Sequence, residues 1–256
     1  LSTEQLGLRA KASNKKLLSL EAFPPSITLH YAQDFNAYTI LAKYADGVTR
    51  DVTFESSFKI EDPEIIRIQD ATVYPISNGK TKLSVSYRNL KVDVPVSISQ
   101  CEENREVSFK LDVMPIFMKA GCNTGSCHGS ARGQDRFMLS LFGYDPVGDH
   151  YRITREQGTR RINLALPEES MLLEKAVGAV PHTGGKLFDK ESTHWHTLHK
   201  WLKAGAPKDS EDVATPERVE LFPSSLFMEG KGATQQVTVL AHYSDGTTRD
   251  VTSLRS

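Results

Sequence analysis

The sequence has few cysteines, almost no net charge and no long apolar run. Three cysteines are an odd number, so one thiol has no disulfide partner within the chain. The formal net charge is -1 and basic residues form no long run, which disfavours nucleic acid or an anionic membrane surface as a partner. No apolar stretch approaches the length needed for a membrane span. The chain opens at Leu1 without a signal peptide, so export has to be inferred from other features.

An apolar content of 39% and a charged content of 25% are typical of an ordinary globular protein. A length of 256 residues predicts one to three domains. Residues 1–18 are polar, and we interpret them as a lead-in with a short helix around residues 4–9.

Residues 19–100 show the period-two alternation of β-strands. Turn signals, Asp46-Gly47 and Asn78-Gly79, lie between the runs. Several short strands at regular spacing predict a β-sandwich. The predicted strands cover residues 26–29, 38–42, 83–87 and 92–98.

The decapeptide at residues 44–53, Tyr-Ala-Asp-Gly-Val-Thr-Arg-Asp-Val-Thr, resembles the hallmark of bacterial immunoglobulin-like (group 2) domains. The resemblance implies a spacer or adhesion module at residues 19–100. A sandwich fold by itself implies no particular activity.

A second copy of the decapeptide stands at residues 243–252, 199 positions after the first. The match extends upstream without gaps, so a second immunoglobulin-like domain is predicted to begin near Thr215. Residues 213–256 hold only its N-terminal half, because Ser256 corresponds to Ser57. We therefore expect the chain to be a piece of a longer protein. The half domain should pack on the rest of the chain, pair with a neighbouring copy as a dimer, or be partly disordered.

The stretch richest in chemistry is Gly121–Gly129, where Cys122 and Cys127 precede His128. Two thiols followed at once by an imidazole suit covalent haem attachment, although the spacing is C-x-x-x-x-C-H. Gly121 and Gly125 allow the backbone to pass close to a flat ring. Two other interpretations remain open. One is a zinc site with a fourth ligand from His182 or the group His194, His196 and His199, and the other is a Cys122–Cys127 disulfide.

Three helices are predicted around this loop. One is capped by Asp112 and leads into Cys122. A second begins at Pro167, and a third is capped by Ser192 or Thr193 and ends at Gly205. The apolar residues of the first and third recur at helical spacing.

With these motifs, residues 107–207 resemble the planctomycete-type cytochrome c domain. The matching pieces are residues 112–116, 120–129, 167–173, 181–185 and 201–207. The resemblance implies an all-α cytochrome c-like domain at residues 101–212, between the two immunoglobulin-like segments.

The resemblance also implies one covalent haem c attached through Cys122 and Cys127, with His128 as the proximal iron ligand. A methionine that often ligates the iron's other face is replaced by Val180. His182 is the first choice for this distal position, and the odd thiol Cys101 is the alternative. A methionine ligand or an open position are two further possibilities.

The function implied is electron transfer to an unidentified redox partner protein, within a larger exported protein of the periplasm or cell surface. The alternatives are ligand sensing or catalysis at an open haem position, and a non-haem adhesion or structural module with a disulfide or zinc site. The chain by itself is expected to be an electron-transfer module rather than an enzyme. The histidines at 194, 196 and 199 are interpreted as surface groups, and some arginines at 132–161 as partners of haem propionates.

Overall fold

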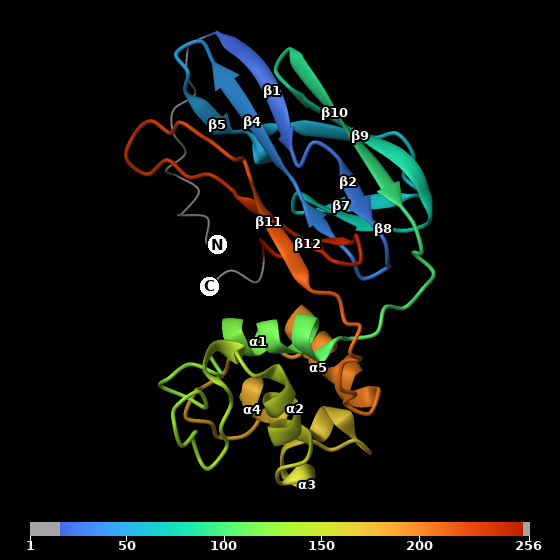
Figure 1. Ribbon diagram of the computed structural model, residues 1–256. Coiled ribbons are helices and arrows are strands. Elements are labelled where there is room, and N and C mark those ends of the chain that lie inside the picture. The colour runs from blue at the N-terminus through green and yellow to red at the C-terminus, as the bar shows by residue number, and fades with distance from the viewer. Residues whose placement is uncertain (1–15, 253–256) are drawn as a thin grey trace. The chain divides into compact units, whose positions relative to one another are not determined.

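A computed structural model describes residues 16–252, which form two compact units (Figure 1). Within this range the first unit consists of residues 16–105 and 214–252, and the second of residues 106–213. The helix expected at residues 4–9 and the end of the chain at Ser256 lie outside the described residues.

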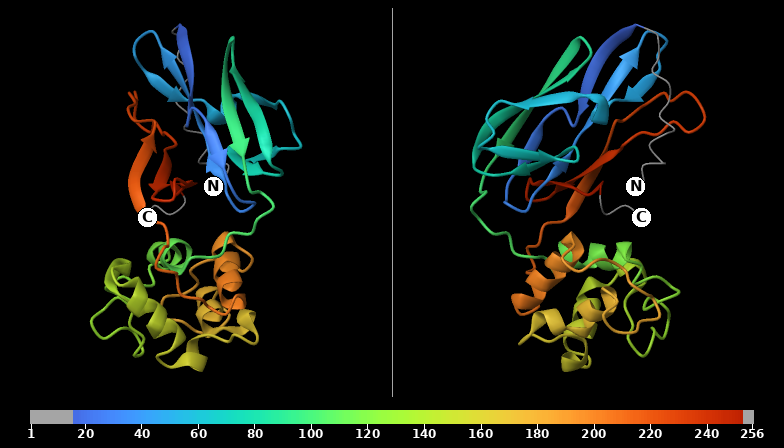
Figure 2. Two further views of the ribbon diagram at one scale, coloured as in Figure 1. Left: turned by 45° about the vertical axis from the view of Figure 1, so that its right-hand side comes forward. Right: turned by 180° about the vertical axis from the view of Figure 1, so that it is seen from behind.

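The first copy of the repeat is built from ten short strands. Their bounds are β1 Leu17–Phe23, β2 Ile27–Leu29, β3 Asn36–Ala37, β4 Thr39–Tyr44, β5 Thr49–Asp51, β6 Ser57–Ile60, β7 Ile66–Gln69, β8 Thr72–Pro75, β9 Gly79–Tyr87 and β10 Leu90–Ile98. They form three sheets with the orders β1-β4-β5, β2-β10-β9-β6 and β3-β8-β7. Figure 2 shows these strands from two further directions.

The strands alternate buried and exposed residues because one face of each sheet packs on a shared core. In β9, for example, Leu83 and Val85 are buried, while Ser84 between them is less so. Ile40 from β4 and Val96 from β10 belong to the same apolar cluster. The core therefore lies between the sheet of β1 and the sheet of β10.

The described residues of the second copy form the counterpart of one sheet. β11 (Pro216–Phe222), β12 (Thr238–Tyr243) and β13 (Thr248–Asp250) have the order β11-β12-β13. β11 and β12 pair as β1 and β4 do, and the register shift after Leu17 recurs after Pro216. This half copy lies in the same compact unit as the first copy and is hydrogen bonded to it, which is one of the three outcomes expected for it.

The faces of the two equivalent sheets differ in exposure. Leu20 and Ala22 on β1 are buried beneath the sheet of β10. Their counterparts on β11, Val219 and Leu221, are each 54% exposed. The second copy thus exposes an apolar face on β11. The equivalent face of β1 in the first copy is covered by the other strands of that copy.

The second unit contains five α-helices joined by long irregular segments. The helices are α1 Met114–Lys119, α2 Pro146–Thr154, α3 Gly158–Arg161, α4 Met171–Ala176 and α5 Thr193–Lys203. Single turns of tighter or wider helix precede some of them, at Phe109–Val113, Leu141–Gly143 and Pro167–Glu169. α5 begins at Ser192, whose hydroxyl accepts a hydrogen bond from the Trp195 N–H.

The prediction that Asp112 caps the first helix is wrong. The cap is Ser108, whose hydroxyl accepts from the Leu111 N–H, while the Asp112 carboxylate accepts from the Ser108 N–H. The reciprocal pair satisfies the same backbone groups as a capping box, although the acid stands four residues after the cap instead of three. The helix therefore starts one turn earlier than the sequence suggests.

The prediction of an all-α cytochrome c-like domain at residues 101–212 is also wrong. The described part of the chain is mainly β-sheet, and its helices are short. α1 and α4 have six residues each, and only α5 reaches eleven. Glycine and polar residues between positions 121 and 145 favour turns over helix, so much of this unit is irregular.

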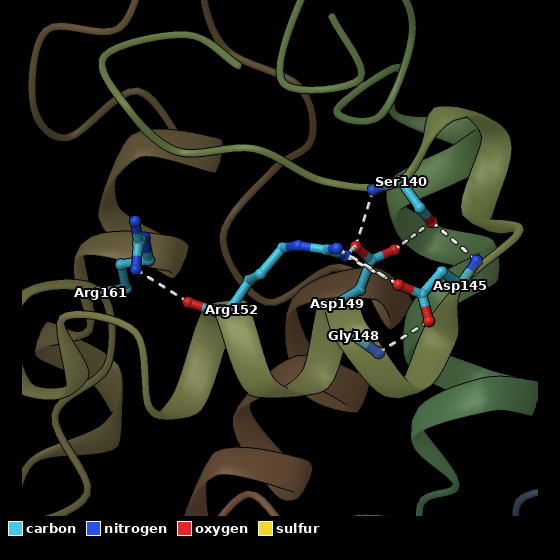
Figure 3. A network of polar contacts seen from close by, with 6 residues as sticks. All are labelled: Ser140, Asp145, Gly148, Asp149, Arg152 and Arg161. Carbon is cyan, nitrogen blue, oxygen red and sulfur yellow. Dashed lines mark hydrogen bonds and ion pairs between the residues drawn. The ribbon is translucent and has the colours of Figure 1, made fainter. Parts of the chain in front are cut away.

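A buried polar network stabilises the irregular segment before α2 (Figure 3). The Asp149 carboxylate is completely buried and accepts from the Ser140 N–H at 2.7 Å and the Ser140 hydroxyl at 2.5 Å. Arg152 donates to Asp149 at 2.8 Å and to Asp145 at 3.3 Å. Asp145 also caps α2 by accepting from the Gly148 N–H. One carboxylate thereby attaches the loop at Ser140 to the helix.

Candidate functional site

The loop Gly121–Gly129 follows α1 and is closed by its own backbone. The Cys122 N–H donates to the Phe117 carbonyl at the end of the helix, and the His128 N–H donates back to the Cys122 carbonyl at 3.0 Å. The Gly129 N–H donates to the Thr124 carbonyl at 3.0 Å. These bonds bring the start and the end of the cysteine–histidine motif together.

Gly129 is required by this closure. A β-carbon added at Gly129 would lie 2.2 Å from the Asn123 carbonyl oxygen, a backbone atom that cannot move aside. At Gly125 the same addition would meet only the Leu141 side chain, at an ordinary 3.8 Å. The loop's shape thus requires glycine at position 129 because of this close approach, and it favours glycine at position 121, where φ is +75°.

His128 is held by the carbonyl of Phe137. Its Nδ1 lies 2.8 Å from that oxygen, which can only accept, so Nδ1 carries the proton and Nε2 is the unprotonated nitrogen of the neutral ring. The rings of His128 and Phe137 have centroids 4.6 Å apart. Burial lowers the pKa of His128, and the nearby His182 and Lys175 lower it further, against the opposing effect of the Phe137 carbonyl.

His182 lies beside His128, with ring centroids 6.3 Å apart and ring planes 11° from parallel. The Nδ1 of His182 donates to the Gly185 carbonyl at 3.2 Å. A β-carbon at Gly184 would come within 2.9 Å of the His182 ring, so Gly184 leaves room for it. The structure therefore brings these two predicted site residues together.

Cys122 and Cys127 are both free thiols, each partly buried. Burial raises the pKa of Cys122 to about 12, and the neighbouring Cys127 adds to the increase. At neutral pH the Cys122 sulfur is therefore protonated and is not a nucleophile.

Cys101, the alternative distal ligand, lies in the first unit. It is 8% exposed and belongs to the apolar core of the sandwich, and its N–H donates to the Asn78 side chain. Burial raises the pKa of its thiol, with smaller contributions from Glu102 and Asp34. It packs as a small apolar residue.

Asn123, between the cysteines, was not singled out by the sequence. Its side chain is completely buried, and neither amide atom has a hydrogen-bond partner within the protein. Its backbone carbonyl accepts from the Phe142 N–H, which ties the loop to the following turn. Nothing in the sequence distinguishes this asparagine from a solvated loop residue.

The other candidate groups make local contacts. His196 and His199 on α5 lie near the carboxylates of Glu191 and Glu168, at 3.3 and 3.7 Å. Arg161, expected among the partners of haem propionates, donates to the carbonyls of Arg152 and Glu156 and lies 4.3 Å from the centre of the Phe137 ring.

No family model and no curated protein matches the chain. Among solved structures it is similar to parts of the S-layer protein SbsC. Its domains 4 and 5 match with 14% identity and a TM-score of 0.28 over 34% of this chain and 54% of that one. Domains 5–6 match with 13% identity and a TM-score of 0.29 over 36% of this chain and 49% of that one. A longer SbsC fragment, residues 31–844, matches with 13% identity and a TM-score of 0.30 over 36% of this chain and 14% of that one.

Two findings overturn the predicted haem c and the resemblance to a cytochrome c domain. No family model matches, and over residues 16–252 no group of three or more His, Cys, Asp or Glu side chains could hold a metal ion. The assignments of iron to His128, with His182 or Cys101 as distal ligand, fall with the haem, and so does electron transfer. The physical reason is that a short Cys–His motif also suits a tight turn, in which its backbone groups are satisfied by one another.

The described residues also include no helix with the length and apolarity to cross a bilayer. The site is thus a compact loop with two thiols and two stacked imidazoles, whose Nδ1 atoms are engaged by backbone carbonyls.

Proposed function

We propose that this chain is a structural or adhesion module of an exported protein. Its loop-rich helical unit lies in the sequence between two copies of one β repeat. The observation that carries the proposal is the repeat itself. Two segments 199 positions apart each fold into a three-stranded sheet, and the two sheets have equivalent strand order and register. Packing of one module on a second copy of itself builds a larger unit from repeated parts, which supports a role in holding or spacing other parts.

The polar groups of the second unit support a structural role. The completely buried Asp149 joins a loop to a helix, and Arg161 binds two carbonyls and an aromatic ring. The protonated nitrogen of His128 is used by the Phe137 carbonyl. These side chains stabilise irregular backbone, where a helix or sheet would satisfy its own polar groups.

The two thiols of the loop add a covalent element to the proposal. The 3.0 Å bond from the His128 N–H to the Cys122 carbonyl brings the backbone next to Cys127 close to Cys122. In an oxidising compartment, thiol–disulfide exchange would join Cys122 to Cys127. Two S–H bonds break and one S–S bond forms, and the two protons and two electrons reduce the disulfide of an exchange partner to two thiols.

The proposed cross-link requires an oxidising compartment, because disulfides persist there. The proposal therefore places the protein in the periplasm or at the cell surface. The cross-link would hold the loop in the conformation that its glycine and backbone bonds define.

The test is a mass measurement of the denatured, unreduced chain, after export from a host that also contains haem-attachment machinery. We expect a colourless protein, lighter than the fully reduced chain by two hydrogen atoms, with Cys122 and Cys127 in one linked peptide. A variant with both replaced by serine is the control and should have its unmodified mass. A chain that carries a porphyrin mass surviving denaturation would overturn the proposal.

A further inference from the structure

The two copies of the repeat meet through positions that are equivalent in the repeat. Phe23 ends β1, and Phe222, 199 positions later, ends β11. Their rings are stacked, with centroids 6.0 Å apart and planes at 29°. A residue that touches its own counterpart lies close to an axis that relates the two copies by a half turn.

Reciprocal hydrogen bonds support the same relation. Asp51 of the first copy accepts from the Gln236 N–H of the second at 2.9 Å. Asp250, the counterpart of Asp51, accepts from the Ala37 N–H of the first copy at 2.6 Å. Ala37 is itself the counterpart of Gln236. A contact in which residue i meets j while j meets i is the mark of an isologous interface.

In both aspartates, one carboxylate oxygen accepts a hydrogen bond from its own turn and the other accepts one from the opposite copy. In the first copy, Oδ1 of Asp51 accepts from the Thr53 N–H of its own turn, and Oδ2 accepts from the other copy. In the second copy, Oδ1 of Asp250 accepts from the Thr252 N–H, and Oδ2 accepts from Ala37. The local turn thus uses one oxygen and leaves the other directed at the neighbouring repeat.

The rim of the contact is less symmetric. The Thr49 N–H donates to the Phe227 carbonyl at 2.9 Å, and the Phe227 N–H donates to the Thr49 hydroxyl at 2.9 Å. The counterpart of Phe227 is Thr28, which in the first copy pairs with Ser97 on β10. No strand equivalent to β10 occurs among the described residues of the second copy, and Phe227 bonds to the edge of β5 instead.

We propose that the Thr-Arg-Asp end of the repeated decapeptide is a repeat-pairing element, and that the surface formed by Phe23, the Ala37 N–H and Asp51 binds a second copy of the same repeat. The partner is recognised by a phenylalanine at the end of its first strand, a backbone N–H just before its β4 equivalent, and an aspartate whose Oδ2 accepts from the N–H of the opposite copy. This proposal stands on the repeat geometry and is independent of the proposed function.

The experiment measures hydrogen exchange of individual backbone amides in the full chain. Asp250→Asn leaves a single side-chain acceptor where two are used. We expect the Ala37 amide, 213 positions away, to exchange about 10- to 100-fold faster, because it loses a charge-assisted hydrogen bond. Asp51→Asn should accelerate exchange of the Gln236 amide by a similar factor.

The matched control is Asp245→Asn. Asp245 belongs to the same decapeptide and accepts from the Thr247 N–H within its own turn. It should leave exchange at Ala37 unchanged. If Asp250→Asn accelerates only its own turn, near Thr252, the pairing element is refuted. If the Asp250 variant does not fold, the Asp51 variant decides by the same readout at Gln236. Protection should also be independent of protein concentration, and its loss on dilution would overturn pairing within the chain.

Discussion

Gly129 shows how a single residue determines the shape of the loop. Replacing it with alanine forces a methyl group to within 2.2 Å of the Asn123 carbonyl oxygen, so the backbone must shift. We expect Gly129→Ala to lower the free energy of unfolding of the second unit by about 3 kcal/mol. Thermal or denaturant unfolding monitored by tryptophan fluorescence measures this, since both tryptophans lie on α5.

The matched substitution is Gly125→Ala in the same loop. Its added methyl group meets only the Leu141 side chain at 3.8 Å, so its effect should stay within about 0.5 kcal/mol. Equal losses from both substitutions would show that the loop is tolerant and that its closure is not what Gly129 serves.

His128 gives the second unit a pH dependence. Its pKa in the folded protein is lowered from the ordinary value of 6.5, chiefly by burial, so below that pH the unfolded chain binds more protons than the folded one. Stability is therefore complete above pH 6.5 and declines as the pH falls toward the lowered value. Unfolding followed between pH 7.5 and pH 5 should show this decline.

His128→Asn tests the assignment, because an asparagine amide can still donate to the Phe137 carbonyl but does not titrate. The variant should show a shallower decline below pH 6.5 than the natural protein. His194, whose pKa burial also lowers, should contribute to the decline that remains in the His128 variant.

At the scale of elements, Asp149 joins α2 to the irregular segment before it. Asp149→Asn leaves the Arg152 guanidinium without its closest carboxylate and reduces the acceptors offered to Ser140. We expect a loss of about 3 kcal/mol in the free energy of unfolding, as for other broken buried ion pairs.

The control is Asp145→Asn on the same helix. Asn also caps helices well, so this variant keeps the cap and loses only the 3.3 Å ion pair between Arg152 and a side chain that is 36% exposed, which should cost less than about 1 kcal/mol. A cost for Asp149→Asn no larger than this would show that the network does not hold the loop.

The elements differ in how well the sequence predicts them. Strands with period-two alternation were placed correctly, since the predicted run at residues 83–87 falls within β9 and that at residues 92–98 within β10. α5 was also expected, because Ser192 and its apolar spacing are strong local signals. The Asp112 cap was misplaced because Ser108 offers the same chemistry four residues earlier, and local patterns do not choose between them.

The candidate site is less predictable from the sequence than the strands and α5. The sequence predicts a site that includes His128 and His182, and the two rings do lie 6.3 Å apart, but the motif does not say what they do there. The hydrogen bond to Phe137, the burial of Asn123 and the demand for Gly129 all depend on segments folding back over long irregular stretches. Motif spacing carries no information about such closure, so haem, zinc and disulfide share one sequence pattern.

At the scale of the whole molecule, the repeat offers equivalent positions in unequal environments. Leu20 is 9% exposed in the first copy, whereas its counterpart Val219 is 54% exposed in the second. We expect Leu20→Ala to cost about 2 to 3 kcal/mol in the free energy of unfolding of the first unit. Val219→Ala should change it by less than about 0.5 kcal/mol. Denaturant unfolding of the two variants measures the difference, and similar costs at both positions would show that the β11 face is covered in solution.

The contact between the copies depends on main-chain amides, which every residue except proline supplies. Ala37 and Gln236 fill equivalent places although they share no side-chain chemistry, and the aspartate opposite each accepts the same kind of N–H. Evolution can therefore exchange these residues freely while the joint persists. Homologous modules should therefore be searched for by the spacing of Phe, Asp and Thr and not by overall sequence identity.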